Sequence, residues 1–165
     1  MKVKNQTNSY LTFQIGNEEF GAHVSEVLNI LEMREITQVP DAPGYMKGVI
    51  NLRGIVLPVI DTRIKFNMSP TQITDNTCIV VMDINDNNEI IHIGALVDSV
   101  IAVREFEDNE IHSSPKIGNT YKSEFIKGVV ETEYSFIMIL DLIKLFTSDE
   151  LNEMKAQPEN IIESN

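Results

Sequence analysis

The sequence YMKGVINLRGIVLPVIDTRIKF, residues 45–66, carries the clearest structural pattern in the chain. Two apolar runs are separated by Arg53-Gly54, which is typical of two β strands joined by a tight turn. Asp61 follows the second run directly and predicts the N-cap of a short helix that extends to residue 66. The segment therefore predicts a strand–strand–helix unit.

A similar pattern recurs 80 residues later, in FIKGVVETEYSFIMILDLIKLF, residues 125–146. The two segments align without gaps, and the identical pairs are Lys47/Lys127, Gly48/Gly128, Val49/Val129, Asp61/Asp141 and Phe66/Phe146. Chance similarity between two β segments is the alternative explanation. The placement of Gly before one strand and Asp after the next favours a duplication. The repeat therefore predicts two small, similar β barrels in one chain.

The composition supports a mostly β fold. Ile and Val together outnumber Leu and Ala more than twofold, and β-branched side chains suit a pleated sheet. A polar stretch with Pro70 at its centre, residues 67–76, is the best candidate for a linker. We therefore expect two subdomains, about 10–66 and 67–147, with an acidic C-terminal helix or tail at 148–165.

The charge excludes some classes of partner. The chain has 165 residues and a net charge of −12, and an acidic protein opposes binding to nucleic acid or to an anionic membrane surface. A single cysteine forms no internal disulfide, and neither a signal peptide nor a membrane span is evident. We therefore expect a cytoplasmic protein without nucleic-acid partners or direct membrane insertion.

Motifs of enzymes are absent from the sequence. The three histidines, His23, His92 and His112, lack the spacing of metal ligands, and Cys78 begins an apolar strand that favours a buried, inert thiol. No nucleophile elbow, phosphate-binding loop or dinucleotide motif occurs. We therefore expect a binding module with no catalytic residue, metal or cofactor. A small β-barrel enzyme is the minority alternative.

The two copies of the repeat differ at the turn, where NLRG (residues 51–54) lies over ETEY (131–134). A shared scaffold does not require the residues at such a position, so Arg53 is a candidate contact residue. The alternative is an ordinary solvated arginine. Upstream, Ser25 precedes Val27, Leu28, Ile30 and Leu31, a spacing that predicts a short amphipathic helix.

The sequence GVINLRGIVLPVIDTRIKF, residues 48–66, closely resembles the signature of the CheW family of bacterial chemotaxis adaptors, G-V-x-N-L-R-G-x-x-x-P-V-x-D-L-R. The resemblance continues in FQIGNEEFG (13–21), IGALVDSV (93–100) and FIKGVV (125–130), and covers about residues 10–147.

The resemblance implies two five-stranded SH3-like β barrels with short helices, with terminal strands that can be exchanged between the barrels. It also implies a non-catalytic scaffold that couples the histidine kinase CheA, through its regulatory domain, to the cytoplasmic tips of methyl-accepting chemoreceptors. Such a protein works in the cytoplasm at membrane-associated receptor arrays. An adaptor for a CheA-like kinase in a pathway other than chemotaxis is the alternative.

The resemblance also suggests binding residues. A receptor tip is a helical hairpin, so its site is expected to be an apolar groove with a few polar groups. The family's groove positions correspond to Val27, Asn29, Ile30, Arg53, Gly94, Val100 and Val103. Asn29 stands where family members commonly carry an acid. The loop from residue 39 to 46 is a candidate kinase contact or a plain barrel connection, and its proposed contact residues are Val39, Pro40 and Met46.

Overall fold

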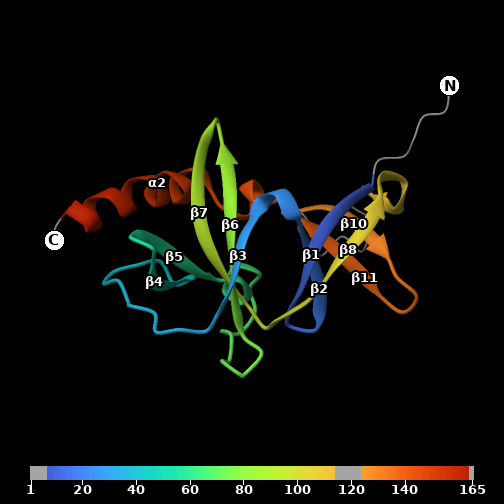
Figure 1. Ribbon diagram of the computed structural model, residues 1–165, viewed down its shortest axis with the longest axis horizontal. Coiled ribbons are helices and arrows are strands. Elements are labelled where there is room, and N and C mark those ends of the chain that lie inside the picture. The colour runs from blue at the N-terminus through green and yellow to red at the C-terminus, as the bar shows by residue number, and fades with distance from the viewer. Residues whose placement is uncertain (1–6, 114–123, 164–165) are drawn as a thin grey trace.

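Two curved β sheets lie side by side in the computed structural model, which describes residues 7–113 and 124–163 (Figure 1). The first sheet has six strands, in the spatial order β8 (Ser99–Glu107), β1 (Thr7–Ile15), β2 (Glu18–His23), β11 (Phe136–Leu140), β10 (Ile126–Glu131) and β9 (Ile111–His112). The second sheet has five strands, in the order β3 (Val27–Glu32), β6 (Cys78–Asp86), β7 (Glu89–Val97), β5 (Ile55–Asp61) and β4 (Met46–Leu52). The expected β fold is confirmed, and the two-residue strand β9 brings the first sheet to six strands.

The chain enters the second sheet after β2 and leaves it after β7, so β3–β7 form an insertion between the strands of the first sheet. Strands β5 and β6 flank the expected linker at 67–76, and both belong to the second sheet. The expected division near residue 67 therefore does not separate the sheets. Strand pairing, which joins β5 to β6 through β7, decides the sheet membership rather than the polar composition of the loop.

The two copies of the repeat form the same local unit. In each copy the strand register shifts at the glycine, Gly48 in one and Gly128 in the other. The amide of Asp61 donates to the carbonyl of Tyr45 at 2.8 Å, and the amide of Asp141 donates to that of Phe125 at 2.7 Å. Gly48 has no alternative, because a Cβ there would lie 2.2 Å from the Thr37 carbonyl oxygen and φ is +153°.

The described residues form three apolar core clusters. One fills the interior of the second sheet, a second fills the interior of the first, and the largest lies between the sheets and extends to the C-terminal helix. Two aromatic contacts cross between the repeat copies. Phe66 stacks on Phe125 at a centroid distance of 4.7 Å, and Phe146 packs on Tyr45 at 6.1 Å. In each contact, the last residue of one copy packs on the first residue of the other. The two copies are therefore related like the halves of a two-fold symmetric dimer.

The predicted helix at residues 25–31 is wrong. A single 3₁₀ turn, η1 (Val24–Glu26), is followed directly by strand β3. Leu31 is buried while Leu28 and Ile30 are exposed, and β3 pairs with β6 along its length. Cross-strand pairing and the β-branched side chains outweigh the helical spacing of the apolar residues here.

The predicted cap at Asp61 is confirmed. Helix α1 (Thr62–Lys65) begins directly after it, and the Asp61 side chain accepts a hydrogen bond from the Arg63 amide at 3.1 Å. The carboxylate is buried and also accepts from the amide and hydroxyl of Thr71, at 3.0 and 2.7 Å. Asp61 therefore ties the loop after α1 to the end of β5.

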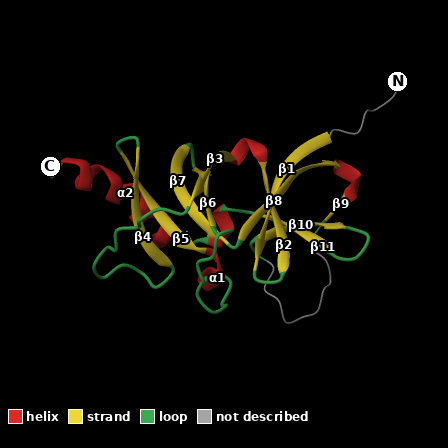
Figure 2. Ribbon diagram, turned by 60° about the horizontal axis from the view of Figure 1, so that its bottom comes forward, coloured by secondary structure: helices red, strands yellow, loops and turns green. Residues whose placement is uncertain are grey.

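The acidic C-terminal segment forms helix α2 (Ser148–Glu163), which lies against β5 and extends beyond the sheets (Figures 1 and 2). Its side chains are described as far as Lys155. Leu151 and Met154 are buried in the core between the sheets, and Glu150 pairs with Lys65 of α1 at 2.7 Å. Neither α2 nor any other described helix has the length and apolar character of a membrane span.

Candidate functional site

Strands β3 and β8 are the terminal strands of the two sheets, and they lie on either side of the line where the sheets meet (Figure 1). A pocket joins the C-terminal end of β3 to the start of β8. It is lined by Glu32, Met33, Ile73, Thr74, Asp75, Asn76, Thr77, Cys78, Ser99 and Val100. The strands on both sides of the sheet boundary therefore contribute to one surface.

Each of these strands carries two exposed apolar side chains beyond the pocket. On β3, Leu28 is 54% exposed and Ile30 is 44% exposed. On β8, Ile101 is 42% exposed and Val103 is 63% exposed. The two residues on each strand are two positions apart, so they share one face of the strand. We call these four residues the β3–β8 surface.

The structure brings two of the expected receptor-binding residues to this surface, Ile30 and Val103. Val27 and Val100 are partly buried and pack on the core between the sheets. The Asn29 side chain accepts a hydrogen bond from the amide of Ile30 at 2.8 Å, within its own strand.

Sequence reasoning missed Leu28 and Ile101. The alternation of residue types along a strand would have identified both, because each lies two residues before an expected contact residue. The helical interpretation of residues 25–31 concealed this pattern for Leu28.

Gly94 does not lie on an exposed face. It is buried in β7 beside Val59 of β5, where a Cβ would meet the Ile79 side chain at 2.7 Å. Its expected place among the contact residues is therefore corrected to a packing role, since only glycine lets these side chains approach the strand so closely.

Arg53 lies at the tip of the β4–β5 hairpin, where its backbone is in the left-handed region with φ +54°. The Asn51 side chain accepts a hydrogen bond from the Gly54 amide at 2.8 Å, which stabilises this turn. The Arg53 side chain is exposed and has no hydrogen bond or ion pair with any described residue. Its guanidinium is therefore available to an external carboxylate or carbonyl.

The loop expected to contact the kinase is only partly exposed. Pro40 is exposed and Val39 is half-buried, but Met46 is the first residue of β4 and is 8% exposed. Met46 therefore belongs to the core rather than to a contact surface. Tyr45 is also engaged internally, because the Lys65 ammonium lies 4.2 Å from the centroid of its ring. Burial beside the Glu150 carboxylate raises the pKa of the Tyr45 hydroxyl.

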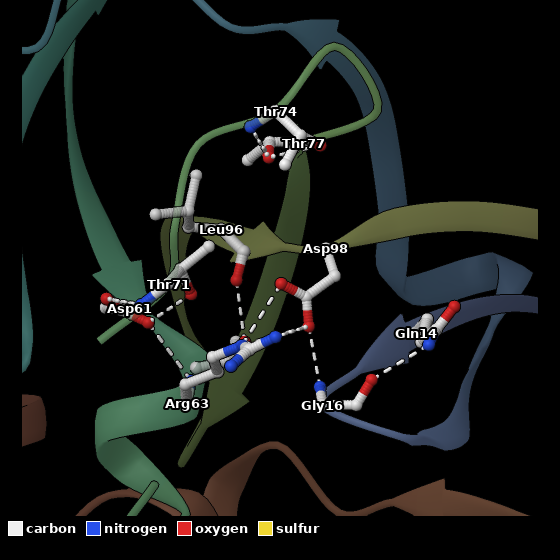
Figure 3. Close-up of polar contacts among 10 residues, drawn as sticks. Gln14, Gly16, Asp61, Arg63, Thr71, Thr74, Thr77, Leu96 and Asp98 are labelled. Carbon is white, nitrogen blue, oxygen red and sulfur yellow. Dashed lines mark hydrogen bonds and ion pairs between the residues drawn. The ribbon is translucent and has the colours of Figure 1, made fainter. Parts of the chain in front are cut away.

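A partly buried ion pair links the two sheets at the end of β7 (Figure 3). The Asp98 carboxylate accepts from Arg63 Nε at 3.1 and 3.0 Å and lies 2.9 Å from its Nη2. The same carboxylate accepts from the Gly16 amide at 2.6 Å, in the turn between β1 and β2. We call these three residues the Asp98 network.

The chain passes between the sheets at Asp98 and again at η1, between β2 and β3. The ion pair at η1 is longer than the one at Asp98. Glu26 ends the η1 turn between β2 and β3, and Lys127 of β10 lies 3.8 Å from it. The Glu26 Oε1 atom is buried and has no hydrogen-bond partner among the described residues. Burial therefore raises the pKa of Glu26, although Lys127 opposes this change.

The described residues contain no group of three His, Cys, Asp or Glu side chains placed to hold a metal ion. His92 lies beside Asp83 on the neighbouring strand, and His23 bonds Ser25 at 2.7 Å and Asn8 at 3.1 Å. His112 is an exposed residue of β9. The His23 and His92 contacts therefore stabilise a turn and a strand pair.

Comparisons with known proteins agree with these observations. A family model described as "CheW-like domain" matches residues 9–150. The chain is 30% identical to the chemotaxis protein CheW of Klebsiella aerogenes, over 86% of this chain and 83% of that protein. It is 33% identical to the chemotaxis protein CheW of Bacillus subtilis, over 79% of this chain and 81% of that protein.

A solved structure is also similar. The crystal structure of scaffolding protein TtCheW from Thermoanaerobacter tengcongensis matches with a TM-score of 0.76 and 26% identity. The match covers 88% of this chain and 96% of that one.

Proposed function

The chain belongs to the CheW family, and from this premise we propose that its β3–β8 surface binds the helical tip of a chemoreceptor. The protein is a non-catalytic scaffold of chemotaxis, which couples the histidine kinase CheA to chemoreceptors. Its partners are therefore receptors and CheA, and the proposal concerns which residues meet them. We also propose that it works in the cytoplasm, at receptor arrays.

The observation that carries the proposal is the pair of exposed apolar side chains on each of two edge strands, one from each sheet. Leu28 and Ile30 on one strand and Ile101 and Val103 on the other form two apolar rows. An amphipathic helix can bury its apolar face against two such rows.

Polar contacts fix the register of a docked helix, and we assign this role to Arg53. Its exposed guanidinium has no internal partner among the described residues, so binding requires no existing ion pair to break. A planar fork of donors pairs with a carboxylate in a geometry that lysine does not reproduce.

For the kinase, we propose that Val39 and Pro40, in the loop before β4, contact the regulatory domain of CheA. Pro40 is exposed and Val39 is half-buried, and Asp41 beside them adopts φ +60° in the turn. Met46 is no longer part of this proposal because it is buried.

A pair of charge substitutions tests the receptor site. We expect Ile30→Glu and Val103→Glu each to weaken binding to a receptor cytoplasmic fragment by about tenfold or more, because each places a carboxylate in an apolar contact. Ile90→Glu is the matched control, since Ile90 is 59% exposed at the β6–β7 turn, outside this surface. Binding is measured by co-sedimentation and by titration calorimetry. Wild-type binding by both surface variants would contradict the assignment.

A second substitution tests Arg53. We expect Arg53→Glu to reduce receptor-dependent activation of CheA while the thermal unfolding midpoint stays unchanged, because the side chain has no internal partner among the described residues. Arg53→Lys keeps the charge and is the control for the planar fork. Normal kinase activation by folded Arg53→Glu would remove this residue from the site.

A further inference from the structure

The chain crosses between the sheets at two places in the described residues, and the crossings lie at opposite ends of β3 and β8 (Figure 1). One crossing is η1, which leads from β2 into β3. The other is Asp98, which separates the last residue of β7 from the first residue of β8. The relative position of β3 and β8 therefore depends on how these two crossings are held.

Asp98 lies between strand pairings of the two sheets. In the second sheet, Glu32 of β3 pairs with Cys78, and Cys78 pairs with Val97, the residue just before Asp98. In the first sheet, Ser99 pairs with Gln14, and the Asp98 amide donates to the Gln14 carbonyl at 2.9 Å. Glu32 and Ser99 both line the pocket between β3 and β8. Asp98 therefore directly precedes the part of β8 that lines this pocket.

The Asp98 side chain bonds to both sheets at once (Figure 3). Arg63 belongs to α1, which follows β5 of the second sheet, and Gly16 belongs to the β1–β2 turn of the first. The side chains of Asp98 and Arg63 are only 16% and 27% exposed. An ion pair with several well-aligned hydrogen bonds and little solvent is rigid, because water does not replace its bonds readily.

The repeat contains no second copy of this network. Ile143, which occupies the position equivalent to Arg63, is exposed, and the other crossing has the 3.8 Å contact between Glu26 and Lys127. One end of the β3–β8 surface is therefore held by a carboxylate that bonds to both sheets. At the opposite end, η1 has the long Glu26–Lys127 ion pair and local bonds between Ser25 and His23.

We propose that Asp98 is a positioning residue for the receptor-binding surface. Through Arg63 and Gly16 it fixes the angle between the sheets, and this angle sets the separation of the apolar rows on β3 and β8. The inference rests on the proposed function of that surface. Asp98 itself is not proposed to touch the receptor.

The variants for the test are Asp98→Asn and Arg63→Lys. The first removes the charge and presents a donor to Arg63 or Gly16, and the second keeps the charge but loses the fork. Asp86→Asn is the matched control, because Asp86 accepts from Lys155 of α2 at 2.8 Å and is 21% exposed, but its ion pair does not join the two sheets. If Asp98→Asn does not fold, Arg63→Lys still tests the inference, since the Gly16 bond to Asp98 remains.

The direct readout is the distance between spin labels at Asn88, in the β6–β7 turn of the second sheet, and at Glu105 in β8 of the first, in the full-length protein with Cys78 replaced by Ser. We expect both variants to broaden or shift this distance distribution. We also expect them to weaken binding to a receptor cytoplasmic fragment by about fivefold, the scale of coupling changes away from a site. Binding to the CheA regulatory domain stays within twofold of wild type. The control is unchanged in all three measurements.

Unchanged distances in Asp98→Asn and Arg63→Lys would overturn the inference, and so would changed distances with unchanged receptor affinity. Loss of receptor binding that only follows global unfolding, seen as a parallel loss of CheA binding, would also overturn it. The proposed function fails separately, if Ile30→Glu and Val103→Glu bind the receptor fragment normally.

Discussion

At the scale of single residues, Glu26 is the most unusual carboxylate in the described chain. Its Oε1 atom is buried without a hydrogen-bond partner, and burial raises its pKa. The folded state therefore binds a proton at Glu26 more readily than the unfolded state. This group lowers stability as the pH rises from the unfolded pKa through the folded one, and the loss persists at neutral pH.

We therefore expect Glu26→Gln to raise the thermal unfolding midpoint at pH 7. The gain shrinks as the pH falls through the titration range and vanishes where Glu26 is protonated in both states. Glu105→Gln, at an exposed carboxylate of β8, is the control for the change in net charge. A midpoint gain in Glu26→Gln no larger than in this control, measured by calorimetry from pH 4 to 8, would contradict the argument.

Gly48 shows how strictly one position can be specified. A Cβ at this residue would overlap the Thr37 carbonyl, whereas a Cβ at Gly54 meets nothing within 4 Å. We expect Gly48→Ala to lower the free energy of unfolding by about 3 kcal/mol or more, because both strain and overlap act there. Gly54→Ala, with φ +85°, carries strain alone and is expected to cost about 1 kcal/mol. Urea denaturation compares the two, and equal losses would contradict this account of the bulge.

At the scale of elements, helix α2 completes the core between the sheets. Leu151 is 4% exposed and Met154 is 2% exposed, and both belong to the largest apolar cluster. We expect Leu151→Ala to lower the free energy of unfolding by about 2–4 kcal/mol, because it leaves a cavity in this cluster. Asn152→Ala, at an exposed position of the same helix, is the control. A loss below about 1 kcal/mol for Leu151→Ala would show that α2 contributes little to the core.

The sequence predicts some elements well and others poorly, for physical reasons. The strand–strand–helix unit at residues 45–66 is predictable because its signals are local. Gly48 marks a shift in strand register, and Asp61 caps the helix that follows. The sequence favours a helix at β3 because its apolar residues fit both the helical and the strand period over so short a run. Its strand partner β6 begins more than forty residues later, and short-range patterns do not report such pairings.

The candidate site was predictable in part for the same reason. Ile30 and Val103 follow from the family resemblance, and the structure places both on the β3–β8 surface. Leu28 and Ile101 follow only once both segments are known to be strands. Nothing local marks Gly94 or Met46 as buried, because their burial depends on β5 and on the barrel interior.

At the scale of the whole molecule, the duplicated architecture gives two curved sheets joined by a shared core, with the β3–β8 surface along their boundary. A scaffold needs separate surfaces so that two partners bind at once. The proposed receptor surface at the boundary and the proposed kinase contact at Val39 and Pro40 are separate surfaces of this kind. Modest affinity at each site suffices, because many linked contacts in an array add their effective concentrations.

The central claim is that the apolar β3–β8 surface couples receptor to kinase. The most direct measurement is receptor-stimulated CheA autophosphorylation, reconstituted with wild-type protein, Ile30→Glu or Ile90→Glu. The account predicts that Ile30→Glu loses most of the stimulation while it still binds the CheA regulatory domain, and that Ile90→Glu behaves as wild type. Full stimulation by a folded Ile30→Glu variant would contradict it.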